Sequence, residues 1–312
     1  MKVVTGLRAL AAPPRRAVVT IGMFDGVHVG HQRLIRTTVR WARRLHGTSV
    51  VMTFHPDPQQ VLEPRRARPP LMPLDVRLRR IAELGADLTW VIRFTAHFST
   101  VTADAFLRDL LIRRLQAQCV VVGSNFGFGK DRQGTLALLR AFGKRHGIRI
   151  VVVPPVRRGG EPVSSSRIRR VIDAGRVDEA GRLLGRPVEL RGVVVHGAGR
   201  GRQLGFPTAN VRLAAQWRPP TGVYRVWLDA GGRRRAGLMN LGYRPTFGSG
   251  PLTCEVFLLG PTPRLYGRPV TIGVLERIRD ERRFTSPRAL VKQIGRDLVR
   301  AGFKKPAVTL SL

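Results

Sequence analysis

The hydrophobic pattern divides the chain into two halves with different periodicity. In the first half, short apolar runs alternate with stretches whose apolar residues recur every three to four positions, as in buried strands followed by amphipathic helices. We expect strands at residues 18–21, 50–54, 90–94, 120–122 and 150–153. We expect helices at residues 32–46, 75–84, 103–117 and 135–146. This order predicts an α/β fold with a parallel sheet covered by helices on both faces.

The second half contains short strands and turns rich in glycine and proline. The strands are expected at residues 188–195, 223–228, 236–241, 254–259 and 270–278, followed by a helix over 287–301. Several short strands at this spacing predict a small β-barrel, with the terminal helix beside it. A length of 312 residues suits two domains, which we place at 1–185 and 186–312.

The first predicted strand leads into a glycine-rich turn that carries two histidines. Gly22, Gly26 and Gly30 allow tight turning and close approach of a ligand to the backbone. His28 and His31 lie three positions apart where the next helix begins, and free N–H groups at a helix start attract anions. The turn should also lie beyond the carboxyl end of a parallel strand, where such sheets bind ligands. The segment therefore predicts a site for a nucleotide's phosphates.

Two other interpretations of the histidines are weaker. A lone histidine at such a corner is most often a satisfied polar residue, but two histidines around a glycine favour phosphate binding. A metal site is disfavoured because no further histidine or cysteine cluster at ligand spacing lies nearby.

Three more polar segments follow predicted strands, at residues 54–58, 123–129 and 164–169. The serine run Ser164 to Ser166, taken alone, is best explained as a helix cap worth about 1 kcal/mol. With Arg169 one turn further on, the same segment can bind a pyrophosphate through hydroxyls, amides and a guanidinium.

Composition adds a strong positive charge without a clear nucleic-acid site. The net charge is +35, but the basic residues are spread through every segment and only six of the 55 are lysine. This pattern indicates a bias in residue usage as much as a binding surface. We expect small-molecule substrates and no specific nucleic acid, although non-specific RNA binding in low salt stays open.

The remaining composition indicates a cytoplasmic protein. Hydrophobic residues make up 43% of the chain, as in globular proteins, and no apolar run is long enough for a membrane span. Cys119 and Cys254 form no Cys-x-x-Cys pair, so a reducing compartment is expected. Arg8 and a proline pair interrupt the only apolar stretch near the start, so no signal peptide is expected. The oligomeric state is left open.

The motifs together resemble one family along nearly the whole chain. The chain resembles the bacterial bifunctional riboflavin kinase/FAD synthetase in four segments. They are residues 22–31, the Gly-x-Asn-Phe-x-Phe-Gly segment at 123–129, Ser-Ser-Ser-x-Ile-Arg at 164–169, and the string at 201–210 that ends in Gly-Phe-Pro-Thr-Ala-Asn. The histidine motif alone is shared with other nucleotidyltransferases and class I aminoacyl-tRNA synthetases. The last string, in a predicted C-terminal barrel, favours the flavin enzymes. A tRNA synthetase is excluded because a Lys-Met-Ser-Lys-Ser-like loop and an anticodon-binding region are lacking.

For the first half, the resemblance implies a Rossmann-like nucleotidyltransferase domain that transfers the adenylyl group of ATP to FMN. The FMN phosphate is already an anion, so positioning and charge stabilisation should supply the rate. His28 and His31 would stabilise the transferring phosphate. The implied nucleotide-binding residues are Gly22, Phe24, Asp25, Gly26, Gly30, Asn125, Ser164, Ser165, Ser166 and Arg169. Phe54, His55, Pro56 and Phe126 are candidates for lining the flavin pocket.

For the second half, the resemblance implies a riboflavin kinase barrel that uses ATP and Mg²⁺. Riboflavin's hydroxyl must lose a proton, so a base is needed, and Glu255 matches the family's catalytic glutamate. Thr208 and Asn210 match the pair that binds Mg²⁺ and phosphate, and Gly205 belongs to the same string. Without the resemblance, residues 207–210 would be interpreted as a turn and Glu255 as a surface carboxylate.

Several positions depart from the family pattern. Asn125 and Gly127 stand where many relatives have Asp and Arg, and Ser166 where they have Thr. Phe257 stands where His is usual, Gly260 where an acidic residue is usual, and Asp often precedes the Leu265 position. Two alternatives follow: an FMN adenylyltransferase with an inactive kinase barrel, and a non-enzymatic regulator of the same fold that binds flavin or RNA. The expected substrates and products are riboflavin, FMN, FAD and ATP.

Overall fold

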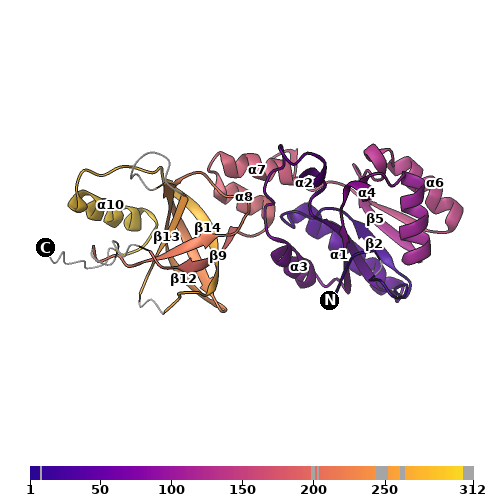
Figure 1. The fold of residues 1–312 in the computed structure, drawn as a ribbon, viewed down its shortest axis with the longest axis horizontal. Coiled ribbons are helices and arrows are strands. Elements are labelled where there is room, and N and C mark those ends of the chain that lie inside the picture. The colour runs from indigo at the N-terminus through magenta and orange to yellow at the C-terminus, as the bar shows by residue number, and fades with distance from the viewer. Residues whose placement is uncertain (8, 198–200, 202–203, 244–251, 261–263, 305–312) are drawn as a thin grey trace. The chain divides into compact units, whose positions relative to one another are not determined.

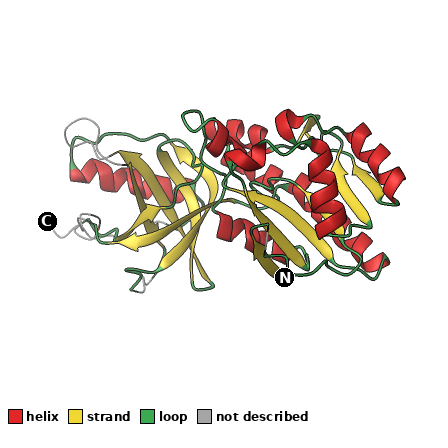
Figure 2. Cartoon of the chain, turned by 45° about the vertical axis from the view of Figure 1, so that its right-hand side comes forward, coloured by secondary structure: helices red, strands yellow, loops and turns green. Residues whose placement is uncertain are grey.

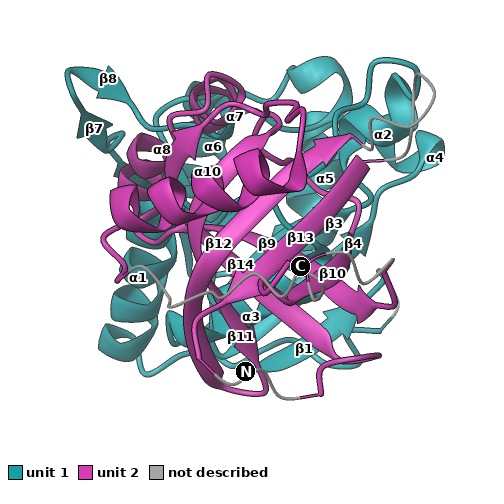
Figure 3. Ribbon diagram, turned by 90° about the vertical axis from the view of Figure 1, so that its left-hand side faces the viewer, with its two compact units in different colours: residues 1–165 teal, residues 166–312 magenta. Residues whose placement is uncertain are grey.

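The chain folds into two compact units in the computed structural model (Figure 1). The structure describes residues 1–312 outside 8, 198–200, 202–203, 244–251, 261–263 and 305–312. The first unit comprises residues 1–165 and the second residues 166–312 (Figure 3). Helices and strands alternate along the first unit, whereas strands dominate the second (Figure 2). No helix among the described residues is long and apolar enough to cross a membrane.

The first unit is built on a six-stranded parallel sheet in the order β1-β4-β3-β2-β5-β6. Its strands are β1 (Lys2–Thr5), β2 (Val18–Ile21), β3 (Ser49–His55), β4 (Leu88–Arg93), β5 (Cys119–Gly123) and β6 (Arg149–Val153). Five of these strands were predicted within two residues at each end. The sixth, β1, pairs with β4 at the edge of the sheet.

Helices follow the strands as the periodicity predicts. They are α1 (Val29–Arg44), α2 (Pro58–Leu62), α3 (Leu74–Glu83), α4 (Ala96–Ser99), α5 (Ala103–Phe106) and α6 (Leu136–His146). The helix expected at 103–117 is present as α5 followed by the π-helical segment η1 (Leu107–Arg114). A short 3₁₀ turn, η2 (Lys130–Arg132), and a hairpin of β7 (Arg157–Arg158) and β8 (Glu161–Pro162) complete the unit.

The core lies on both faces of the parallel sheet. Alternate strand residues point to opposite faces. Residues such as Val19 and Trp90 pack with Leu111 of η1 on one face. Val51 packs on the other face with Ile35 of α1, in a separate cluster. The prediction of helices on both faces is confirmed.

The second unit is a closed antiparallel barrel with helices on its outside. Its strands are β9 (Val188–Val195), β10 (Thr208–Leu213), β11 (Gly222–Ala230), β12 (Arg233–Tyr243), β13 (Leu252–Leu258) and β14 (Pro269–Arg279). They close in the order β10-β13-β12-β11-β14-β9. Helix α7 (Ser165–Asp173) begins at the last residue of the first unit, and α8 (Val177–Leu184) packs on β14 and β9. Helix α10 (Pro287–Arg300) buries Leu298 in a cluster with Phe206 and Ile278.

Candidate functional site

The turn between β2 and α1 lies at the carboxyl edge of the sheet, where β2 runs between β3 and β5. Three of its residues have positive φ: Phe24 at 51°, Gly26 at 80° and Val27 at 38°. Gly22 starts the turn, and its N–H donates to the Met52 carbonyl at 3.1 Å. A side chain at Gly22 would contact the Phe24 ring, because a Cβ there would lie 3.2 Å from Phe24 Cζ. The chain is thus folded tightly where the phosphate site was predicted.

His28 and His31 are brought together at the start of α1. His28 is the N-cap residue, and its Nδ1 accepts the His31 backbone N–H at 3.3 Å. The two rings stack with their centroids 3.6 Å apart. Gly30 allows this arrangement, since a Cβ on it would lie 3.1 Å from His28 Nδ1. Because His28 Nδ1 accepts a hydrogen bond, the neutral ring carries its proton on Nε2 and can donate from there.

The His31 imidazole is electrostatically poised to be neutral. Burial, with the adjacent His28 and Arg77, lowers its pKa well below the ordinary value of 6.5. Its Nδ1 is buried and has no hydrogen-bond partner among the described residues. A neutral imidazole beside a helix N-terminus suits hydrogen bonding to phosphate oxygens.

The buried carboxylate of Asp25 fixes the middle of the turn. Both of its oxygens accept the Leu71 N–H, at 2.9 and 3.0 Å. The Asp25 carbonyl accepts the Ser165 hydroxyl at 2.9 Å, so one serine of the predicted pyrophosphate segment is tied to the histidine turn. Asp25 thus ties the middle of the turn to the backbone at Leu71 and to the side chain of Ser165.

The rest of the serine segment is less enclosed. Ser164 and Ser166 are exposed, and Ser166 and Arg169 belong to the second unit. Arg169 lies one turn along α7, and its guanidinium sits 5.4 Å from the centre of the Trp217 ring. Trp217 Nε1 donates to Asp173 at 2.8 Å. Sequence reasoning missed Trp217, a half-buried aromatic residue in a loop, because only the fold places it beside α7.

Asn125 and the candidate flavin-lining residues follow the neighbouring strands. Asn125 is exposed two residues after β5, and its Oδ1 accepts the Ser124 hydroxyl at 3.2 Å. Phe126 stacks on Phe128 with centroids 5.3 Å apart, whereas Phe54 lies 6.2 Å from Phe94. The two aromatic groups come from different strand ends. The peptide between His55 and Pro56 is cis, and burial with Arg77 lowers the pKa of His55.

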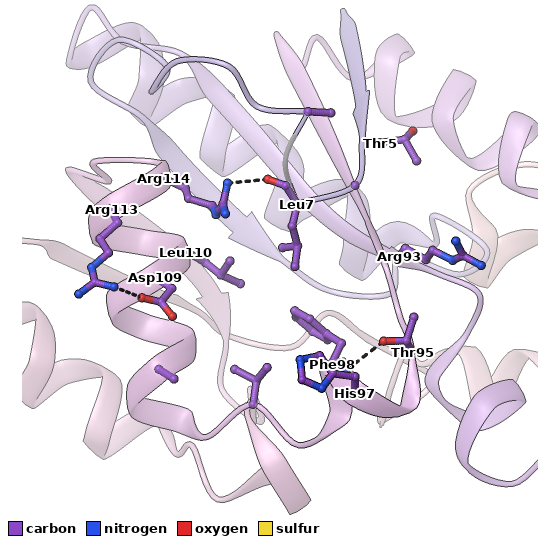
Figure 4. Close-up of a pocket in the computed structure, with 14 residues that line it drawn as sticks. Thr5, Leu7, Arg93, Thr95, His97, Phe98, Asp109, Leu110, Arg113 and Arg114 are labelled. Carbon is purple, nitrogen blue, oxygen red and sulfur yellow. Dashed lines mark hydrogen bonds and ion pairs between the residues drawn. The ribbon is translucent and has the colours of Figure 1, made fainter.

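A hollow of about 1080 Å³ lies beside the carboxyl ends of β1 and β4 (Figure 4). None of the predicted site residues lines it. Two of its arginines are engaged: Arg113 donates to Asp109 at 2.9 Å and Arg114 donates to the Leu7 carbonyl at 2.7 Å (Figure 4). The residues that line this hollow therefore include none from the histidine turn.

The barrel places three predicted residues on one outer face. Thr208 and Asn210 are alternate residues of β10, and Asn210 lies opposite Glu255 of β13. All three are half-buried, whereas the intervening Ala209 is buried. The Glu255 carboxylate makes no hydrogen bond or ion pair with any described residue. A carboxylate in such a position can accept a proton from a bound hydroxyl group.

The sequence analysis missed Asn240 at this site. It lies on β12 directly opposite Glu255, so Glu255 has an asparagine on each neighbouring strand. The signal in the sequence is an amide within an otherwise apolar run, between Met239 and Leu241. The run predicts a short barrel strand, and nothing in the sequence places its one polar residue beside Glu255.

The residues beside Glu255 fit a magnesium ion bound together with ATP. The Thr208 hydroxyl and the Asn210 amide supply oxygen ligands of the kind that Mg²⁺ prefers. Two glycines leave room beside these side chains. A Cβ on Gly201 would lie 3.1 Å from Thr208 Oγ1, and a Cβ on Gly197 would collide with the Asn210 amide. Gly205 turns the chain into β10 with φ of 78°. Arg202 and Gln203 of the same string lie outside the described residues.

Two departures from the family pattern have structural reasons. The Phe257 ring packs against Phe206 at 5.3 Å between centroids, so it joins the cluster under α10. Gly260 has φ of 77°, a conformation that glycine adopts without steric cost. Tyr266, next to the third departure, stacks on His196 at 4.0 Å.

A buried arginine beside the histidine turn was also missed. Arg77 of α3 donates from Nη1 to the Met23 carbonyl at 2.7 Å and from Nη2 to the Phe54 carbonyl at 3.1 Å. In the sequence it is one of many arginines at helical spacing, so nothing there distinguishes it from a solvated residue.

Comparisons with known proteins agree with the two units. The FAD synthetase family matches residues 10–167, and the riboflavin kinase family matches residues 184–302. The Escherichia coli K12 protein called bifunctional riboflavin kinase/FMN adenylyltransferase is 38% identical, covering 98% of this chain and 100% of that protein. The Bacillus subtilis protein of the same name is 36% identical over 90% of each chain.

A solved structure shares the whole architecture. It is titled a macrolide-efflux protein from Streptococcus pneumoniae, is 32% identical, and superimposes with a TM-score of 0.88 over 97% of this chain and 99% of that one. The two family matches follow one another along the chain, and the Escherichia coli relative is covered over its full length. The chain belongs to the bifunctional riboflavin kinase/FMN adenylyltransferase family.

Proposed function

We propose that the histidine turn carries adenylyl transfer to FMN and that the outer face of β10 and β13 carries phosphorylation of riboflavin. The two activities follow from family membership: the chain is a transferase with riboflavin kinase and FMN adenylyltransferase activities, acting on flavins and ATP. The assignment of each activity to particular residues is the proposal.

In adenylyl transfer, an oxygen of the FMN phosphate forms a bond to the α-phosphorus of ATP while the bond to pyrophosphate breaks. The nucleophile is already an anion, so the site needs no general base. Charge on the transferring phosphate is stabilised by hydrogen bonds from His28 and His31 and by the N-terminus of α1. The glycines of the turn let the backbone approach the nucleotide, and Ser165 joins the turn to the serine segment proposed to hold pyrophosphate.

The observation that carries this assignment is the stacked histidine pair at the N-terminus of α1. Replacing His31 by alanine removes a donor without altering the backbone that caps the helix. We expect His31→Ala to slow pyrophosphate release from FMN and ATP by about 100-fold, the usual effect of losing one such donor. Riboflavin phosphorylation should stay at the parental rate, and loss of both reactions would contradict the assignment.

Phosphorylation of riboflavin differs because its nucleophile is an alcohol. Glu255 takes the proton of the ribityl 5′-hydroxyl. The hydroxyl oxygen forms a bond to the γ-phosphorus of ATP while the bond between that phosphorus and ADP breaks. Thr208 and Asn210 would hold Mg²⁺, which when bound offsets the negative charge of the ATP phosphates. The face that presents Glu255, Asn210 and Thr208 together supports this proposal.

A magnesium titration tests the second assignment. Asn210→Ala should raise the Mg²⁺ concentration needed for half-maximal riboflavin phosphorylation by about tenfold, because one ligand is lost. Arg212→Ala, an exposed change on the same strand, is the matched control. An unchanged Mg²⁺ requirement in Asn210→Ala would remove that residue from the metal site.

The domain division and the location are proposals as well. We place the boundary at 185/186, which assigns α7 and α8 to the adenylyltransferase domain although all of α8, and all of α7 except Ser165, fall within the second compact unit. Limited proteolysis tests this, since cleavage near 185 should release a fragment that makes FAD from FMN. A cytoplasmic location is proposed from the two buried free cysteines. Phe54, His55, Pro56 and Phe126 remain the proposed lining of the flavin pocket.

A further inference from the structure

Arg77 is buried next to the proposed adenylyl-transfer site. Only 6% of its surface is exposed, although it is a charged residue on α3. Its guanidinium links two segments, since Nη1 donates to the Met23 carbonyl at 2.7 Å and Nη2 donates to the Phe54 carbonyl at 3.1 Å. Met23 lies in the histidine turn and Phe54 lies near the end of β3. One planar group therefore joins the carboxyl ends of two adjacent strands.

The histidine turn needs such external contacts. Phe24 and the β-branched Val27 both have positive φ values, which side chains other than glycine adopt only at a cost in conformational energy. Contacts from other segments hold this backbone in place. The Met23 carbonyl also accepts the Thr53 hydroxyl at 3.1 Å, and the Asp25 carboxylate accepts the Leu71 N–H. Arg77 is the positively charged member of this set, and both of its hydrogen bonds go to backbone carbonyls.

The positive charge of Arg77 also faces the titratable groups around the turn. Asp25 and Asp57 favour its charged form, against the burial that lowers its pKa. Burial is the main cause that lowers the pKa of His31 and of His55, and the charge of Arg77 adds to the lowering at both. At His31 the neighbouring His28 contributes more than Arg77 does. The same side chain thus supports the backbone of the turn and the neutral state of its rings.

We propose that Arg77 is a positioning residue for adenylyl transfer, which fixes the histidine turn against the end of β3 through the Met23 and Phe54 carbonyls. The inference rests on the proposed assignment of adenylyl transfer to His28 and His31. Arg77 acts through the backbone, so its loss should affect how well ATP is held and aligned, with the chain still folded.

Two substitutions separate its geometry from its charge. Arg77→Met removes both hydrogen bonds and the charge while keeping a long apolar side chain. Arg77→Lys keeps the charge but offers a single nitrogen, which does not reproduce the fork that spans two carbonyls. The matched control is Arg79→Met, two residues along α3, where the arginine is exposed and lies 4.0 Å from Asp75.

The test measures kcat and KM for ATP in FAD formation from FMN, with riboflavin phosphorylation by the same samples as an internal reference. We expect Arg77→Met to lower kcat/KM for ATP by at least tenfold and to shift the acid limb of its pH profile upward. Arg77→Lys should raise KM for ATP but keep the parental pH profile, because it retains the positive charge. Arg79→Met should match the parent in both reactions.

His28→Ala is included so that two failures can be told apart. If His28→Ala forms FAD at the parental rate, the proposed site itself is wrong. If His28→Ala is inactive and Arg77→Met keeps the parental kcat/KM, only the inference about Arg77 is overturned. Amide hydrogen exchange across β2, β3 and β4 reports folding of the first unit. Loss of protection in both Arg77 variants would make Arg77 a folding residue and would also overturn the proposal.

Discussion

The imidazole rings of His28 and His31 lie 3.6 Å apart and within 19° of parallel, at the first turn of α1. Two cationic rings would repel each other at this distance, so the arrangement disfavours protonation of both rings at once. Gly30 lies close to the His28 ring, and the Phe24 ring packs at 74° to the His31 ring with the ring centres 5.3 Å apart. Changes at these neighbours should therefore act on catalysis through ring position.

Gly30→Ala gives a direct test of this packing. The new Cβ would lie 3.1 Å from two atoms of the His28 ring, so the ring must shift, while alanine in a helix is favoured by up to about 1 kcal/mol. We expect FAD formation to fall by about tenfold with no loss of thermal stability. Gly181→Ala in α8, where the new Cβ makes ordinary contacts, serves as the control. A fully active Gly30→Ala would show that the ring position is unimportant.

The half-buried His31 should make the first unit sensitive to acid. Its pKa is well below 6.5 in the folded chain, so the unfolded chain binds a proton that the folded chain does not. This contribution to stability is complete above pH 6.5 and is lost as the pH falls toward the folded value. Each unit of pKa difference corresponds to about 1.4 kcal/mol.

The expected result is a smaller loss of unfolding free energy in His31→Asn than in the parent between about pH 7.5 and about pH 5.5. Urea unfolding, with pulsed amide exchange of β2 and β3, measures this for the first unit alone. His97→Asn changes an exposed histidine of the same unit and should behave like the parent. Equal losses in His31→Asn and the parent would contradict the shift.

Glu255→Gln should slow riboflavin phosphorylation and leave FAD formation unchanged. The amide keeps the shape of the side chain but no longer accepts the proton, so riboflavin phosphorylation should slow by about 10²–10⁴. FAD formation from added FMN should be unaffected. Glu276→Gln, which alters a half-exposed carboxylate 3.4 Å from Arg225, should leave both rates unchanged. Parental phosphorylation by Glu255→Gln would exclude the proposed base.

Phe257 should prove to be a packing residue. Its ring meets Phe206 at 69°, an edge-to-face contact worth about 0.5–1.5 kcal/mol beyond burial. A double-mutant cycle with Phe206→Leu and Phe257→Leu should therefore show coupling of that size in the unfolding free energy of the barrel. Additive effects of the two substitutions would mean that the contact contributes nothing, and would leave the departure at Phe257 without a structural reason.

Most of the fold could be predicted from the hydrophobic pattern, because each core strand is a short apolar run between turn residues. Besides the short hairpin of β7 and β8, one strand of the parallel sheet and one strand of the barrel were not predicted, for physical reasons. Strand β1 lies at the sheet edge, and only Val4 of its four residues is buried. Strand β10 has its half-buried polar residues, Thr208 and Asn210, on the outer face, so the segment has the composition of a turn. Both strands depend on partners distant in sequence.

The candidate site was predictable where it is local and hidden where it is not. His28 and His31 share one helix turn, so their spacing alone places them together. Arg77 could not be found in this way, because its partners Met23 and Phe54 are 54 and 23 positions away. Asn240 likewise becomes a neighbour of Glu255 only through the pairing of β12 with β13.

The most direct test of two separate sites is His28→Ala supplied with ATP and Mg²⁺ and either riboflavin or FMN, with the flavins separated by chromatography. The account predicts that the riboflavin reaction accumulates FMN at the parental rate, and that FAD formation falls by at least about 100-fold in both reactions. FAD formation at the parental rate, or an equal loss of FMN and FAD formation, would contradict it.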